Sequence, residues 1–125
     1  MGVRGSRVLV VDDSPDVREL FVTLLQLDGA EAVGAATGHD ALAAFRSQHF
    51  DIVMTDLGLP DMAPDTLIRG IVDEARGVEI IVITGAGEPA VTRALQAGAS
   101  VVFTKPCRWI DVHRHLDSLD ATAAA

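Results

Sequence analysis

The chain has 125 residues, the size of one domain, with 49% hydrophobic residues and a net charge of -8. Because an acidic surface is repelled by phosphate backbones and anionic lipid, we expect neither nucleic acid nor a membrane as a partner of this domain. No apolar run approaches the ~20 residues of a membrane helix, and the N-terminus lacks an export signal, so we expect a cytoplasmic protein. We expect one domain over 1–125, with its core at about 7–119 and a flexible tail at 120–125.

Apolar runs of strand length alternate with helical patterns along the chain. The first run, 7–12, precedes a helix that begins after Ser14, with Pro15 in its first turn, and ends before Gly29. The remaining predicted elements are, in chain order, a strand at 31–36, a helix at 38–48, a strand at 51–56, a helix at 65–76, a strand at 78–84, a helix at 89–97, a strand at 100–105 and a helix that carries Trp109, Val112, Leu116 and Leu119 at three- and four-residue steps.

Four of the five predicted strands are almost continuously apolar, which is typical of parallel strands covered on both faces. The run at 31–36 is weaker, as expected of an edge strand. Strict alternation of strands and helices predicts a doubly wound α/β domain, with a five-stranded parallel sheet and helices on both faces.

Polar side chains stand where four of these strands end. They are Asp12 and Asp13, Asp56, Thr84 and Lys105. Each alone could be an ordinary turn or helix start, but the carboxyl ends of the strands are where an open parallel sheet binds ligands. Clustered carboxylates repel one another, by about 4 kcal/mol for a pair ~4 Å apart at an effective dielectric of 20. A hard cation would neutralise them, and Mg²⁺, which takes one or two carboxylates with water and phosphate oxygens, suits the cluster best.

Four motifs carry a resemblance to a known family. They are "VLVVDDSP" at 8–15, "DIVMTDLGLPDM" at 51–62, "IIVITGAG" at 80–87 and "ALQAGASVVFTKP" at 94–106. In this order and spacing they resemble the receiver domain of two-component response regulators over about 7–119. The resemblance implies the flavodoxin-like strand order 2-1-3-4-5. It also implies a phosphorylatable signalling module that is not a turnover enzyme.

The resemblance assigns an acceptor and a metal site residue by residue. Asp56 is similar to the phosphoacceptor, Asp13 to a direct Mg²⁺ ligand, and Asp12 to a ligand that acts mainly through water. The backbone carbonyl of Gly58 would complete the protein's share of the Mg²⁺ coordination.

The resemblance also implies how the phosphoryl group is held and which proteins exchange it. Thr84 is similar to the hydroxyl that binds the phosphoryl group and Lys105 to the lysine that pairs with it. The peptide bond between Lys105 and Pro106 would be cis. The donor would be a phosphohistidine on a sensor histidine kinase or a histidine phosphotransfer protein. An output protein would bind the face formed by the fourth helix, the fifth strand and the fifth helix.

The sequence departs from the family pattern at three places. Ala63 and Pro64 stand where family members commonly have Asp-Gly, so the loop after the third strand is stiffer and lacks a residue free to adopt positive φ. Val102 replaces the usual aromatic switch residue, and Phe103 beside it should point to the opposite face of the strand. Gly85 replaces the usual alanine, which is a milder change.

Three other functions share parts of this pattern. A phosphatase or phosphotransferase of the haloacid dehalogenase type also has a nucleophilic aspartate after a strand, but it generally needs a second acid two residues later, where this chain has Gly58. A flavodoxin-like cofactor binder would have a phosphate loop rich in hydroxyls and glycine, whereas "DDSPD" repels a phosphate that arrives without a cation. A receiver-like binding module that is not phosphorylated is a third alternative. The five polar residues at the strand ends argue against it, whereas Val102 and Pro64 argue for it.

Overall fold

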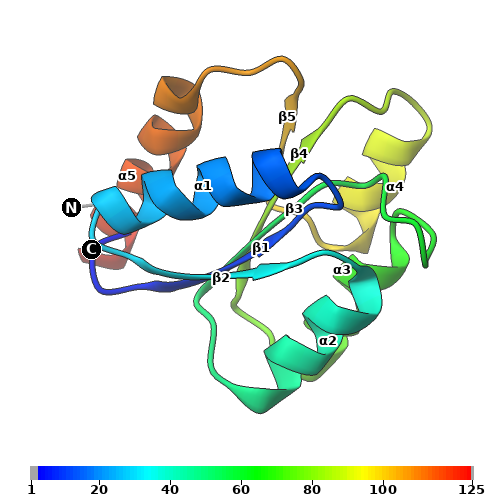
Figure 1. Ribbon diagram of the computed structural model, residues 1–125, viewed down its shortest axis with the longest axis horizontal. Helices are drawn as coiled ribbons and strands as arrows, with labels where there is room; N and C mark the ends of the chain where they lie inside the picture. Colours follow the sequence, from blue (N-terminus) through cyan, green and yellow to red (C-terminus); the bar gives the residue numbers. More distant parts are fainter. Residues whose placement is uncertain (1–2, 125) are drawn as a thin grey trace.

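The computed structural model describes residues 3–124, which form a five-stranded parallel sheet (Figure 1). The strands are β1 (Arg7–Val11), β2 (Glu31–Ala35), β3 (Ile52–Thr55), β4 (Glu79–Thr84) and β5 (Val101–Thr104). Their order in the sheet is β2-β1-β3-β4-β5, and all neighbouring pairs are parallel. The predicted α/β class, the strand order and the edge position of the second strand are confirmed.

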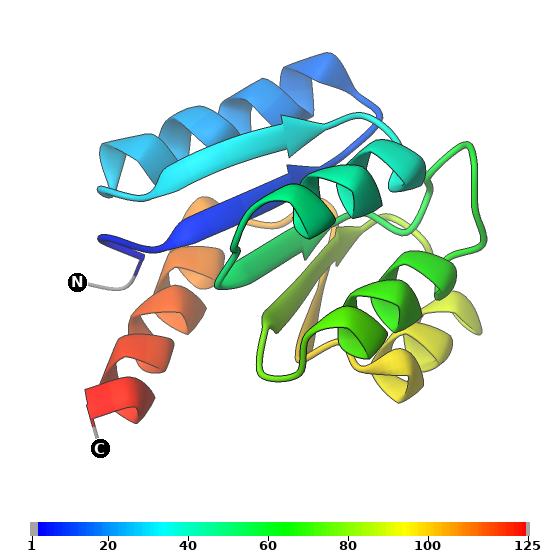
Figure 2. The same ribbon diagram turned by 90° about the horizontal axis from the view of Figure 1, so that it is seen from below.

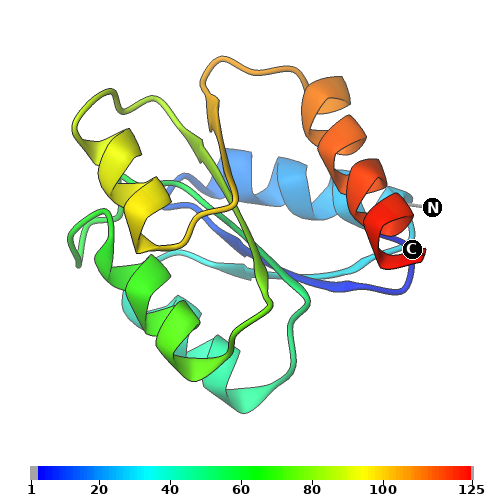
Figure 3. The same cartoon turned by 180° about the vertical axis from the view of Figure 1, so that it is seen from behind.

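Helices cover both faces of the sheet, as Figure 2 shows. They are α1 (Pro15–Leu27), α2 (Gly38–Ser47), α3 (Thr66–Glu74), α4 (Ala90–Ala97) and α5 (Trp109–Ala124). Helices α1 and α5 lie on one face, and α2, α3 and α4 lie on the other (Figures 1 and 3). The sheet therefore divides the core in two: Val8 and Val10 of β1 pack under α1 and α5, whereas Leu9 and Val11 pack under the other three helices.

Local sequence explains where the first two helices begin. The side-chain oxygen of Ser14 accepts a hydrogen bond from the N–H of Val17 at 3.4 Å, and Pro15 occupies the first helical position of α1. Thr37 caps α2 in the same way through the N–H of Asp40, at 3.1 Å. Both caps satisfy backbone donors that have no partner inside the helix.

The helix ends differ in detail from the sequence-based prediction. Helices α3 and α4 begin one residue later than predicted, because Asp65 and Pro89 precede the first helical turn. Helix α3 also ends early, since Ala75 is extended with a φ of -155°. Helix α5 runs to Ala124, so the backbone at 120–124 continues the last helix. That this segment is a flexible tail beyond the core stays a prediction, and residue 125 lies outside the described residues.

The parallel arrangement places all the carboxyl ends of the strands at one edge of the sheet. The chain leaves β1, β3, β4 and β5 at this edge, and the polar residues that the sequence singles out lie at or just after these strand ends. Within residues 3–124, no helix is both long and apolar enough to cross a membrane.

Candidate functional site

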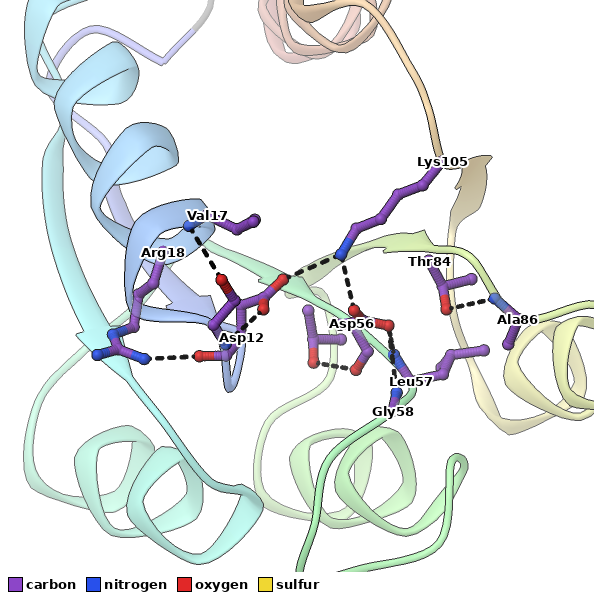
Figure 4. Close-up of polar contacts among 11 residues, drawn as sticks. Asp12, Val17, Arg18, Asp56, Leu57, Gly58, Thr84, Ala86 and Lys105 are labelled. Carbon is purple, nitrogen blue, oxygen red and sulfur yellow. Dashed lines mark hydrogen bonds and ion pairs between the residues drawn. The ribbon is translucent and has the colours of Figure 1, made fainter.

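Side chains from the ends of β1, β3, β4 and β5 converge at this edge, as Figure 4 shows. The Nζ of Lys105 donates to Oδ2 of Asp56 at 2.8 Å and to Oδ2 of Asp12 at 3.3 Å. Thr84, the last residue of β4, lies beside them and is buried. The structure thus brings together four of the five strand-end residues that the sequence predicts to meet.

Asp56 is held by backbone donors as well as by the lysine. Its Oδ1 accepts the N–H of Leu57 at 2.6 Å and the N–H of Gly58 at 3.1 Å. Burial by itself opposes ionisation of Asp56, but the hydrogen bonds from Lys105, the Gly58 N–H and the Thr84 hydroxyl outweigh it and lower the pKa of this carboxyl. Asp56 is therefore a carboxylate at neutral pH, with a side chain 14% exposed to solvent.

Lys105 supplies the positive charge that contacts both Asp12 and Asp56. Burial opposes its charged form, but the hydrogen bond and charge of Asp56, helped by the charge of Asp12, outweigh burial and raise the pKa of the lysine. The ammonium group therefore stays protonated and partly neutralises the two carboxylates beside it.

The two neighbouring aspartates after β1 have different surroundings. Asp12 is buried, and its Oδ1 accepts the N–H of Ser14 at 2.9 Å. Asp13 is exposed and makes no hydrogen bond or ion pair with any residue in the described range 3–124. The structure therefore leaves Asp13 apart from the contacts that join Asp12, Asp56 and Lys105.

The donor set suits a hard cation. Across residues 3–124, no three His, Cys, Asp or Glu side chains are grouped so that they could hold a metal ion by themselves. Mg²⁺ does not need such a cage, because it usually binds one or two carboxylates and keeps several waters. The carboxylates of Asp12 and Asp56 both contact the Nζ of Lys105, so these two side chains fit Mg²⁺ with water among its remaining ligands.

Thr84 presents its hydroxyl at the same edge. Its Oγ1 accepts the N–H of Ala86 at 3.1 Å, which fixes the turn after β4. The predicted cis bond between Lys105 and Pro106 is present. This bond lies where the chain leaves β5, next to the lysine that reaches into the site.

The departures from the family pattern have visible counterparts. Val102 packs with the core beneath α2, α3 and α4, whereas Phe103 belongs to the core on the α1 and α5 side, so the prediction that they face opposite ways is confirmed. Among residues 3–124 only glycines adopt positive φ, so neither Ala63 nor Pro64 does so.

Sequence reasoning missed one residue that contacts the site. Nη1 of Arg18 donates to the backbone oxygen of Asp12 at 2.8 Å. The available signal was Gly34 inside a strand, since a glycine there often marks the close approach of another group. The side chain of Arg18 lies against this glycine.

Comparison with known proteins adds independent findings. The sequence model of the family described as "Response regulator receiver domain" matches residues 8–117. The chemotaxis protein CheY of Thermotoga maritima is 34% identical over 104 residues, which cover 82% of this chain and 87% of that protein. The response regulator protein TrrA of the same organism, solved in complex with Mg²⁺-BeF, has a TM-score of 0.82 and 28% identity, and the match covers 91% of this chain and 98% of that one.

A longer relative contains a similar segment. The protein-glutamate methylesterase/protein-glutamine glutaminase of the group 3 operon of Cereibacter sphaeroides is 36% identical over 130 residues. The match covers 97% of this chain but only 35% of that protein. The chain therefore spans about a third of the length of this relative.

Proposed function

Because the chain belongs to the response regulator receiver domain family, we propose that it accepts a phosphoryl group on Asp56 in a Mg²⁺-dependent reaction and signals through contacts with other proteins. One observation carries the choice of acceptor. Asp56 is the carboxylate that Lys105 contacts most closely, at 2.8 Å, while a buried threonine hydroxyl and a second carboxylate stand beside it.

The chain's own residues have distinct tasks in the transfer. A carboxylate oxygen of Asp56 attacks phosphorus, and an O–P bond forms as the P–N bond of the donor phosphohistidine breaks. The imidazole leaves with the electron pair of that bond. Lys105 and the hydroxyl of Thr84 then contact oxygens of the phosphoryl group, where negative charge accumulates.

Four residues would hold Mg²⁺: Asp12, Asp13, Asp56 and Gly58, the last through its carbonyl. When bound, the ion neutralises charge on the oxygens of the transferred group. The solved complex of the similar protein TrrA with Mg²⁺-BeF supports the choice of Mg²⁺ as the ion. So does the repulsion between carboxylates that a single lysine offsets only in part.

The partners that we propose follow from the family to which the chain belongs. The phosphoryl donor is a sensor histidine kinase or a histidine phosphotransfer protein, and the output protein binds the face formed by α4, β5 and α5. The domain itself is not a turnover enzyme and works in the cytoplasm. The activity of any longer protein that contains such a domain, as the methylesterase does, would come from its other parts.

Phosphorylation by a small phosphodonor such as acetyl phosphate, read by intact mass, tests this function. The wild-type protein should gain the mass of one phosphoryl group only when Mg²⁺ is present. Asp56→Asn should gain none. Asp40→Asn, which removes the same charge from the exposed start of α2, should behave as the wild type.

Two outcomes would contradict the proposal in different ways. Equal labelling of Asp56→Asn would mean that another residue is the acceptor. No labelling of the wild type with Mg²⁺ would favour the alternative of a receiver-like binding module that is not phosphorylated.

A further inference from the structure

Arg18 reaches from the first turns of α1 to the end of β1. Its Nη1 donates to the backbone oxygen of Asp12 at 2.8 Å (Figure 4). This oxygen belongs to the peptide group that joins Asp12 to Asp13. Because a peptide group is planar, a hydrogen bond to its oxygen fixes the orientation of the whole group.

Both the backbone and the side chain of Asp12 are hydrogen-bonded, whereas Asp13 lacks such contacts within residues 3–124. Besides Arg18, the hydrogen-bond partners of Asp12 are the backbone oxygen of Ala35 at 3.2 Å, the N–H of Ser14 at 2.9 Å and the Nζ of Lys105 at 3.3 Å. Asp13 is exposed, and within residues 3–124 it has no such partner. The direction in which its side chain leaves the backbone is therefore set by the peptide group that Arg18 holds.

Gly34 makes room for this arrangement. It is the fourth of the five residues of the edge strand β2 and is exposed. A Cβ at this position would lie 3.1 Å from Cδ and 3.2 Å from Cγ of Arg18, closer than such atoms normally approach. The stem of Arg18 thus crosses β2 in the space that a side chain at position 34 would fill, although a glycine weakens a strand.

We propose that Arg18, seated over Gly34, is a positioning residue that directs Asp13 toward Mg²⁺ by holding the peptide group between Asp12 and Asp13. This inference rests on the proposed function, because it requires Mg²⁺ to bind at this edge of the sheet. Arg18 acts through the backbone and touches neither the ion nor the phosphoryl group.

The positive charge of Arg18, taken by itself, would weaken Mg²⁺ binding instead of supporting it. A guanidinium beside the acidic pair repels a divalent cation, so its removal should tighten Mg²⁺ binding if charge alone mattered. If Arg18 acts by geometry, its removal should weaken binding. The two explanations therefore predict opposite signs for the same substitution.

Mg²⁺ titration of the unphosphorylated protein, followed by calorimetry and by the amide resonances of Asp13 and Ser14, separates them. Arg18→Met removes the donor and the charge but keeps an aliphatic stem. Gly34→Val keeps the charge and fills the space beneath that stem. Both should weaken Mg²⁺ binding roughly tenfold, the usual cost of losing a group that orients a metal ligand.

Two controls exclude a loosened fold and a general charge effect. Valine has a higher strand propensity than glycine, so Gly34→Val should unfold at the same or a higher denaturant concentration than the wild type. Weaker Mg²⁺ binding in that variant would then have a local cause. Arg114→Met, which removes the same charge from an exposed position on α5, should bind Mg²⁺ as the wild type does.

Failure of this inference can be distinguished from failure of the proposed function. If the wild type binds Mg²⁺ but Arg18→Met binds it equally or more tightly, Arg18 does not position Asp13. Wild-type affinity in Gly34→Val would overturn the inference in the same way. If the wild type does not bind Mg²⁺, the proposed function fails, and the inference falls with it.

Discussion

The Nζ of Lys105 and Oδ2 of Asp56 lie 2.8 Å apart, although the two residues are 49 positions apart in the sequence. The same ammonium group is 3.3 Å from Asp12, so one cation joins the loops that follow β1, β3 and β5. Lys105 is the only lysine in the chain, so no second lysine can replace it. We therefore regard it as the group that keeps the acidic edge together before Mg²⁺ or a phosphoryl group arrives.

Lys105→Met is expected to destabilise the metal-free protein by about 1–2 kcal/mol, because two carboxylates lose their shared cation. The loss should be smaller than that of a fully buried pair, since the lysine side chain is 30% exposed. Chemical denaturation with and without Mg²⁺ measures the effect. Mg²⁺ should restore much of the lost stability, since it supplies the missing positive charge, and equal losses with and without the ion would contradict this.

The stability that Lys105→Met loses should depend on pH in a predictable way. The lowered pKa of Asp56 makes its contribution to stability present above its ordinary value of 3.8 and lost as the pH falls through the folded value. The raised pKa of Lys105 makes its contribution present below 10.5 and lost as the pH rises through the folded value. The stability difference between wild type and Lys105→Met should therefore be full near neutral pH and shrink at both extremes.

Asp13→Asn should weaken Mg²⁺ binding and phosphorylation together without destabilising the metal-free fold. Asp13 is exposed and has no partner in the described part of the chain, and its charge repels that of Asp12. We expect the free energy of unfolding to rise slightly, within the ~0.5 kcal/mol that is usual for surface changes. Mg²⁺ titration and denaturation of the same sample measure both quantities. Unchanged Mg²⁺ affinity would remove Asp13 from the site.

The meeting of polar residues at one edge was predictable because parallel strands end on the same side of a sheet. Asp12, Asp56, Thr84 and Lys105 each close a strand, so their proximity follows from the strand pattern alone. The distinct surroundings of the two adjacent aspartates did not follow. They depend on a turn in which the Oδ1 of Asp12 accepts the N–H of Ser14, and the pattern of strands and helices does not report such a turn.

Contacts that depend on how one element packs against another were the least predictable. The contact of Arg18 with the end of β1 depends on how α1 lies against β2. The spacing of apolar residues predicts that a helix and a strand form, but it does not predict which of their residues meet. Likewise, the loop after β3 is anchored to α2 through Asp61, which accepts the N–H groups of Gly38 and His39 at 2.8 and 2.9 Å. In the sequence, Asp61 looks like an ordinary turn residue.

Asp61→Ala should loosen the loop after β3, which begins with the proposed acceptor Asp56. The N–H of His39, together with that of Gly38 and the His39 ring, lowers the pKa of Asp61 to about 2. The stabilisation is therefore present above 3.8 and is lost as the pH falls toward 2. Hydrogen exchange at Gly38 and His39 should be faster in the variant at neutral pH, and this difference should disappear in strong acid. Equal exchange rates at neutral pH would contradict the anchor.

Phosphorylation should shift amide resonances near Thr84 and Lys105 more than those around Val102 and Arg114. Val102 is a half-buried aliphatic residue and lacks the ring that in similar domains moves inward with the threonine hydroxyl. Coupling from the site to the α4-β5-α5 face should therefore be weak. Heteronuclear NMR of the protein with and without the phosphodonor measures the shifts. Large, equal shifts in both regions would show that another residue carries the coupling.

The phosphoryl group on Asp56 should be short-lived, because little covers it. Hydrolysis needs a water molecule in line with the O–P bond. The positions where a side chain could best block this water are 58 and 86, and they are occupied by Gly58 and Ala86. A Cβ at Gly58 would meet only Oδ1 of Asp56, at 3.9 Å, so a larger side chain can be accommodated there. Gly58→Asn, Gly58→Met and Ala86→Tyr should therefore lengthen the lifetime without preventing phosphorylation, because Lys105 still neutralises the developing charge. The decay of the phosphorylated mass after removal of the donor measures this lifetime, and an unchanged or faster decay in these variants would mean that water access is not the limiting step.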